Sequence, residues 1–109
     1  MRRVRLIDLA HGRSGDKGDS SDISIFAYDS KKYAFLKGYL TAERVAAHFA
    51  PIAQGPVERY EVDNLEALKF IVHSALGGGA PRSLRSDNLG KAMASALLRL
   101  EVEVPEEVL

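Results

Sequence analysis

Apolar and polar residues in the first quarter of the chain predict two strands separated by a polar loop. Arg3–Leu9 contains β-branched residues and leucines in succession and is followed by turn-forming residues, which favours a strand. The next segment, His11–Asp22, has three glycines and no apolar residue, so we expect a loop of about a dozen residues there. Alternation at period two in Ile23–Tyr28 then predicts a second strand, paired with the first.

Helical spacing of apolar residues occurs in two places. The first predicted helix begins after Thr41, an expected N-cap, and Pro51 is expected to end or kink it. The second begins after Ser86 or Asp87, near the C-terminus. Their apolar stripes are, in turn, Val45, Phe49 and Ile52, and Leu89, Met93, Ala96, Leu97 and Leu100.

The segments between these helices are mixed in pattern. Lys31–Leu40 is expected to be a helical turn or a covering connection, and Pro56–Val62 an exposed strand. After a short turn at Asn64–Ala67, the apolar alternation of Leu68–Leu76 predicts a strand, although Asn64 could instead cap a helix there.

The expected order of elements, β-β-α-β-β-α, predicts an α+β fold. Two amphipathic helices can bury their stripes on one face of a four-stranded antiparallel sheet, which gives a two-layer ferredoxin-like sandwich. A chain of 109 residues, 46% apolar and 28% charged, has the size and composition of an ordinary globular domain. We therefore expect a single domain covering residues 1–109.

Charge and cysteine content exclude several classes of protein. Fifteen basic and fifteen acidic residues give no net charge, which argues against nucleic acid as the main partner. There is no cysteine, hence no disulfide framework and no thiolate metal site. The N-terminal apolar stretch Leu6–Ala10 is too short for a signal peptide or a membrane span and contains Asp8. We expect a cytoplasmic protein without a membrane segment, and the sequence indicates no cofactor.

The glycine-rich segment after the first predicted strand supplies the first set of candidate ligand-binding residues. Arg13 and Lys17 offer cationic donors, and glycine-rich backbone can expose N–H groups as an anion-binding nest. The segment is not a Walker A loop, because Lys17 precedes Gly18 and a strand follows. The candidates are His11, Arg13, Ser14, Gly15, Asp16, Lys17, Gly18 and Asp19.

An alternative for the same segment is purely structural. Asp16 and Asp19 could cap turns and pair with the neighbouring cations, holding a long connection in one shape. A calcium loop is not indicated, because Asp16, Asp19 and Asp22 are three residues apart and do not match that motif. No metal site is therefore expected.

A second glycine-rich segment, Gly77–Lys91, precedes the C-terminal predicted helix. Its Arg82, Ser83 and Arg85 lie just before the helix N-terminus, an arrangement that suits a phosphate or carboxylate. The alternative is that Asp87 already satisfies the backbone donors of that helix end.

The histidines give little evidence of chemistry. His11, His48 and His73 show no HxH or HExxH spacing, so no zinc site is predicted. Among these histidines, His11 is the one candidate acid or base. Ser14 lacks the context of a nucleophile elbow, and no Ser-His-Asp set can be identified from the sequence. Catalytic residues therefore stay unassigned.

Four strings in the chain resemble a known family: DLAHGRSGDKGDSSDISI, LTAERVAAHF, GPVERYEVDNLEALKFIVHSALGGG and RSLRSDNLGKAMASALL. They are similar to the C-terminal ferredoxin-fold module of the acyclic terpene utilisation family, over about Leu6 to Pro105. The resemblance implies a role in bacterial breakdown of acyclic terpenoids through acyl-CoA intermediates. It also implies a small subunit that pairs with a separately encoded large protein of that family, whose larger members carry a big N-terminal domain before this module.

Three functions follow as hypotheses. The leading one is an accessory or substrate-binding subunit for a branched or terpenoid acyl compound, with its loops facing a partner or a CoA-type anion. The second is an independent hydratase or isomerase with a site at a subunit interface, using His11, Asp16 and Lys17 as acids and bases. The third is a structural module that forms homo-oligomers by covering an open sheet face or edge.

Overall fold

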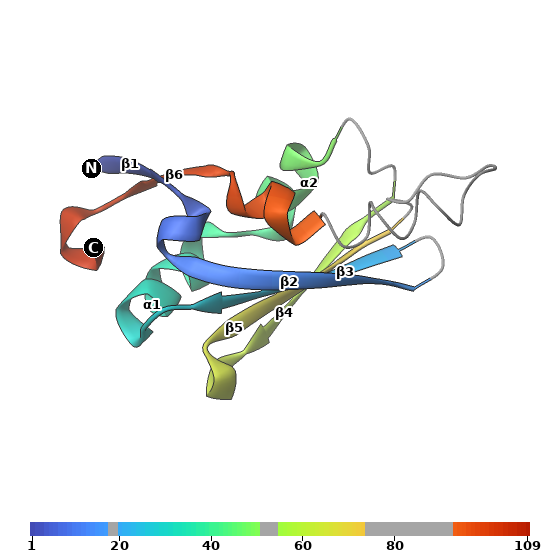
Figure 1. The fold of residues 1–109 in the computed structure, drawn as a ribbon, viewed down its shortest axis with the longest axis horizontal. Coiled ribbons are helices and arrows are strands. Elements are labelled where there is room, and N and C mark those ends of the chain that lie inside the picture. Colours follow the sequence, from blue (N-terminus) through green and yellow to red (C-terminus); the bar gives the residue numbers. More distant parts are fainter. Residues whose placement is uncertain (18–19, 51–54, 74–92) are drawn as a thin grey trace.

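The computed structural model describes residues 1–17, 20–50, 55–73 and 93–109, and for Asp16 and Lys17 it describes the backbone alone. Its centre is an antiparallel sheet with strand order β2-β3-β5-β4. A separate two-stranded ribbon, β1 with β6, brings the two termini to one end (Figure 1). The strands are β1 Arg2–Arg5, β2 Ala10–Lys17, β3 Ser20–Ala27, β4 Val57–Val62, β5 Ala67–Val72 and β6 Glu101–Val104.

Helices cover one face of the sheet. Alternation places Ile23 and Ile25 of β3, with Phe70 of β5, on that face, and all three are at most 1% exposed. They share one apolar core with Leu36 and Val45 from the helical layer. The helical segments are α1 Ser30–Tyr39, α2 Ala42–His48 and residues 93–98, with 3-10 turns η1 Leu6–Asp8, η2 Asp63–Leu65 and η3 Glu106–Val108. The fold is α+β and ferredoxin-like, as the sequence predicts.

The N-terminal prediction is wrong in two respects. The strand expected over Arg3–Leu9 ends at Arg5, and it pairs with β6 rather than with β3. Leu6 and Leu9 are both 0% exposed because a 3-10 turn brings residues three apart to the same side. The ribbon also uses one of the N-terminal cations, since Arg3 pairs with Glu101 and Glu103 across it.

The expected loop over His11–Asp22 is a hairpin instead. β2 pairs with β3 from Ala10 opposite Ala27 to Lys17 opposite Ser20. Its inward positions hold small residues: a Cβ on Gly12 would lie 2.8 Å from Ile25 Cδ1 and 2.9 Å from the Ser24 carbonyl oxygen. Small side chains let the neighbouring elements approach closely, so this strand lacks the large apolar residues by which a strand is normally recognised.

The observed order of elements extends the predicted one. β1 and β6 were not expected as a ribbon, and two helices rather than one follow β3. Lys31–Leu40, expected as a turn or a covering connection, forms α1, which Asp29 caps by accepting a hydrogen bond from the Lys32 amide at 2.8 Å. The strands expected over Pro56–Val62 and from Leu68 are confirmed as β4 and β5. β5 ends at Val72, earlier than the expected Leu76, and residues 74–76 lie outside the described residues.

The predicted caps and stripes of the helices are partly testable. Thr41 caps α2 as expected, accepting from the Arg44 amide at 3.1 Å, and Val45 and Phe49 are buried. Ile52, Pro51 and the region of Ser86 to Lys91 lie outside the described residues. Of the C-terminal stripe, Met93 and Leu97 are buried, as predicted.

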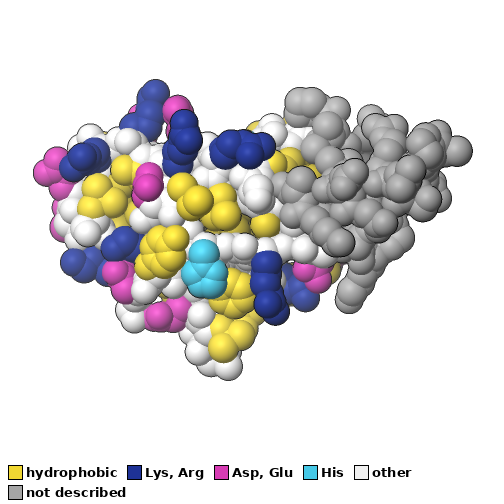
Figure 2. All heavy atoms as spheres, in the orientation of Figure 1, with side chains coloured by type: hydrophobic (Ala, Val, Ile, Leu, Met, Phe, Trp, Pro, Cys, Tyr) yellow, Lys and Arg dark blue, Asp and Glu magenta, His cyan; other side chains and the backbone are white. Residues whose placement is uncertain are grey.

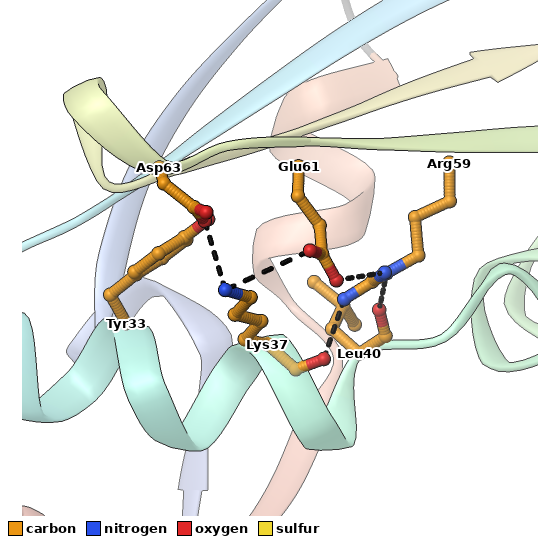
Figure 3. A network of polar contacts seen from close by, with 6 residues as sticks. All are labelled: Tyr33, Lys37, Leu40, Arg59, Glu61 and Asp63. Atoms are coloured by element: carbon orange, nitrogen blue, oxygen red, sulfur yellow. Dashed lines mark hydrogen bonds and ion pairs between the residues drawn. The ribbon is translucent and has the colours of Figure 1, made fainter.

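A polar network fixes α1 to the end of β4 (Figure 3). The Tyr33 hydroxyl donates to Asp63 Oδ1 at 2.6 Å, and Lys37 Nζ lies 3.0 Å from the same carboxylate. Arg59 donates through Nε to the Leu40 carbonyl at 2.9 Å, which satisfies a carbonyl beyond the last turn of α1. Burial and the bond to Asp63 raise the pKa of Tyr33 to about 12.

This raised pKa predicts a loss of stability at alkaline pH. In the unfolded chain a tyrosine ionises near its ordinary pKa of 10.0, whereas folded Tyr33 keeps its proton until about pH 12. The folded state therefore binds more protons in that interval, and its stability falls as pH rises through it. We expect Tyr33→Phe to reduce the decline of the melting temperature across this pH range, measured by circular dichroism. Identical declines in both proteins would contradict the assignment.

Candidate functional site

The face of the sheet opposite the helices, hereafter the outer face, presents polar and aromatic side chains in rows. In an antiparallel sheet, directly opposed residues point to the same side. The registers of β2 with β3, β3 with β5 and β5 with β4 therefore define rows that run across the four strands. The rows are His11–Phe26–Ala67–Val62, Arg13–Ser24–Lys69–Tyr60 and Gly15–Asp22–Ile71–Glu58.

A cationic pocket lies between the second and third rows. It is open to solvent, has a volume of about 490 Å³ and is lined by Arg13, Ser14, Gly15, Asp22, Ser24 and Lys69. Lys69 Nζ is 3.6 Å from Asp22 Oδ2, so its charge is partly balanced. Arg13 is exposed and makes no ion pair with any other residue that the structure describes. The pocket therefore combines a guanidinium that no described acidic side chain pairs with, a second cation and a hydroxyl.

An aromatic group borders this pocket along the strands. The His11 ring stacks on Phe26, with centroids 5.2 Å apart, and on Tyr28, with centroids 5.9 Å apart. Tyr28 is 52% exposed. Figure 2 shows the molecule from the side on which β2 lies in front. On this side a histidine lies among hydrophobic side chains, with Lys or Arg beside it. Two residues along a strand span about 7 Å, so the aromatic row lies about that far from Arg13.

The candidates predicted from the sequence have different positions in this arrangement. His11 and Arg13 lie on the outer face, whereas Ser14 Oγ faces the helical layer and accepts from the Ala94 amide at 3.0 Å. A Cβ on Gly15 would meet nothing within 4 Å, which leaves the pocket open above it. Asp16 and Lys17 are in β2, and their side chains are not described. The remaining candidates lie outside the described residues: Gly18, Asp19, Arg82, Ser83 and Arg85.

The structure adds two residues that the sequence analysis missed. Ser24 and Lys69 come from β3 and β5 and lie in the same row as Arg13. A signal was present, because the alternation that buries Ile23 and Ile25 must place Ser24 on the opposite face. The register that brings Lys69 next to it is a long-range property and has no local signal.

Other places in the described residues offer less chemistry. A second pocket of about 310 Å³, lined by Tyr39, Arg44, Ala47, His48 and Leu100, is mostly apolar, and its Arg44 already stacks 4.0 Å from the Tyr39 ring. Within the four described ranges, no three histidine or acidic residues are grouped so as to hold a metal ion. Nor does any described helix have the length and apolar content that a membrane span requires.

Comparison with known proteins gives one match. A model of the AtuA ferredoxin-like domain matches residues 4–103, which is most of the chain. No curated protein and no solved structure matches.

Proposed function

Since the chain belongs to the AtuA ferredoxin-like domain family, of acyclic terpene utilisation, we propose that it is an accessory subunit that binds CoA thioesters of branched or terpenoid acids. The single observation that supports this most is the cationic pocket at Arg13 and Lys69 beside the exposed aromatic group of His11, Phe26 and Tyr28. CoA joins an adenine ring to several phosphates, and these two neighbouring surfaces suit those two parts.

The energetics favour a ligand that uses both surfaces. Stacking of a base on an aromatic side chain contributes about 1–3 kcal/mol of binding free energy, as measured by substituting the side chain with alanine. Any base can stack in this way. A phosphate bonded to a guanidinium gains roughly 1.5–3 kcal/mol, and arginine offers two parallel donors to it. Neither surface alone discriminates strongly between ligands. A ligand that carries a ring and a phosphate on one scaffold therefore binds more tightly than free phosphate or a free base.

The subunit role rests on the family. We propose that the chain acts in the cytoplasm of a bacterium as a partner of the large protein of its family, with the outer face toward the shared substrate. β4 is an edge strand of the sheet, and an edge strand is a ready surface for association. Homo-oligomers formed through this edge are the competing outcome.

Calorimetric titration tests the ligand, and light scattering on a size-exclusion column tests the partner. We expect CoA to bind at least about tenfold more tightly than pantetheine, which lacks the adenine and its adjoining phosphates. We also expect the affinity for CoA to fall as salt concentration rises, because the phosphate contacts are partly exposed. Equal affinities for CoA and pantetheine would refute the assignment of the ligand. A chain that stays apart from the co-expressed large protein would refute the subunit role.

A further inference from the structure

Beyond the cationic pocket, three polar side chains, from β3, from β4 and from the residue after β5, are joined by hydrogen bonds. Ser20 Oγ at the start of β3 lies 3.2 Å from His73 Nδ1, just after β5. The other ring nitrogen, His73 Nε2, bonds the carboxylate of Glu58 on β4. These contacts were not expected, since the sequence identified no set of serine, histidine and acid. They arise because the register places the start of β3 beside the end of β5.

The bonding pattern suits proton transfer. A carboxylate accepts only, so Nε2 carries the proton that is donated to Glu58, and Nδ1 is then free to accept from the Ser20 hydroxyl. The Tyr60 hydroxyl donates to the second oxygen of Glu58. The bonds from Tyr60 and from His73 lower the pKa of Glu58, which keeps it ionised at neutral pH. A nucleophile, a base and a group that orients the base are thus hydrogen-bonded one to the next.

These three hydrogen-bonded side chains are accessible to substrate and water. The side chain of His73 is 35% exposed and that of Glu58 is 43% exposed. Alternation along β3 places Ser20 on the outer face with Asp22 and Ser24, so it continues the cationic pocket. Six residues separate Ser20 from Phe26, a span of about 20 Å along the strand. A ligand held at the aromatic row by its ring could reach Ser20 with an extended arm.

We propose that Ser20, His73 and Glu58 form a nucleophilic centre that hydrolyses thioesters and other activated esters. The choice of an acyl-CoA as its substrate rests on the function proposed above, whereas the nucleophile itself rests only on the geometry of these three residues.

The reaction balances with water as the only co-reactant. His73 Nδ1 takes the Ser20 hydroxyl proton as Oγ bonds to the thioester carbonyl carbon. The carbon–sulfur bond then breaks, and the leaving thiolate takes the proton from His73. Water next attacks the acyl-serine ester and gives a proton to His73, and the Ser20 oxygen leaves with that proton. The products are a carboxylic acid and a free thiol, and no group is oxidised or reduced.

Covalent labelling tests the nucleophile directly. We expect a fluorophosphonate probe to add one label per chain, detected by intact mass, and the label to be absent in Ser20→Ala. Ser30→Ala is the matched control, because the Ser30 hydroxyl donates to a carboxylate, that of Glu66, and not to a histidine. It should label as the original chain does. A chain that takes no label, or Ser20→Ala that labels normally, would overturn the proposal.

Thioester turnover provides the second measurement. Thiol release from acetyl-CoA can be followed with a thiol reagent because the chain has no cysteine. His73→Ala should lower the rate at least about 100-fold, as expected for loss of a general base. Glu58→Gln should also lower it while keeping a side chain of the same size. Unchanged turnover in folded Glu58→Gln and His73→Ala, with only their melting temperatures lowered, would make the three residues a structural link and refute the centre.

The two proposals fail separately. Labelling of Ser20 without CoA binding in calorimetry would refute the proposed ligand and support the nucleophile. CoA binding without labelling would refute the nucleophile and support the ligand.

Discussion

Exchanging both Arg13 and Lys69 for glutamate is expected to weaken CoA binding by at least about 100-fold. Each cation can contribute roughly 1.5–3 kcal/mol through a charged hydrogen bond, and each factor of ten in affinity corresponds to about 1.4 kcal/mol. The glutamates also repel the phosphates, so the loss exceeds that of two neutral substitutions. Calorimetric titration of CoA into the double variant measures it.

The control is a second double variant with the same change in net charge, made at residues outside the cationic pocket. Lys31 and Arg99 are exposed, and neither forms an ion pair with another described residue. Lys31→Glu with Arg99→Glu should leave the affinity within about threefold, because the Debye length is about 8 Å at physiological salt and screens distant charges. An equal loss in both double variants would show a general charge effect and contradict a site on the outer face.

Phe70→Ala is expected to cost about 3–5 kcal/mol of unfolding free energy, the largest effect on stability among the changes considered. Phe70 is 0% exposed and lies in β5, one of the two central strands. Its partners in the register are Ile23 and Arg59, so truncation leaves a cavity between the sheet and the helical layer. A loss of this size can unfold a domain of ordinary stability.

Urea denaturation followed by circular dichroism measures the cost. Leu65→Ala is the comparison, because Leu65 is 58% exposed in η2 and its truncation should change the stability by less than about 0.5 kcal/mol. Equal costs at the two positions would contradict the assignment of Phe70 to the core.

Local sequence was sufficient to identify the elements whose signals are local. The alternation of β3 and β5 and the cap of α2 at Thr41 follow from neighbouring residues, and the structure confirms them. β2 was missed because its inward positions hold Ala10, Gly12 and Ser14, which lack the bulk that makes alternation visible. Its strand conformation is stabilised instead by pairing with β3.

The site was predictable only in part for the same reason. Arg13 and His11 were selected by composition and lie on the outer face, although in a strand rather than in the expected loop. Lys69 joins them through the order β2-β3-β5, and His73 meets Ser20 across 53 residues of sequence. Such meetings depend on register, which is set by the whole sheet and not by any window of the chain.

Backbone amide NMR during a titration with CoA tests the central claim most directly, since it reports on each residue of the folded chain. The proposed site predicts that the largest shifts occur at Arg13, Ser24 and Lys69 on the outer face, with small shifts at Val45 and Leu97 in the helical layer. Shifts confined to the helical layer, or none at saturating CoA, would contradict it.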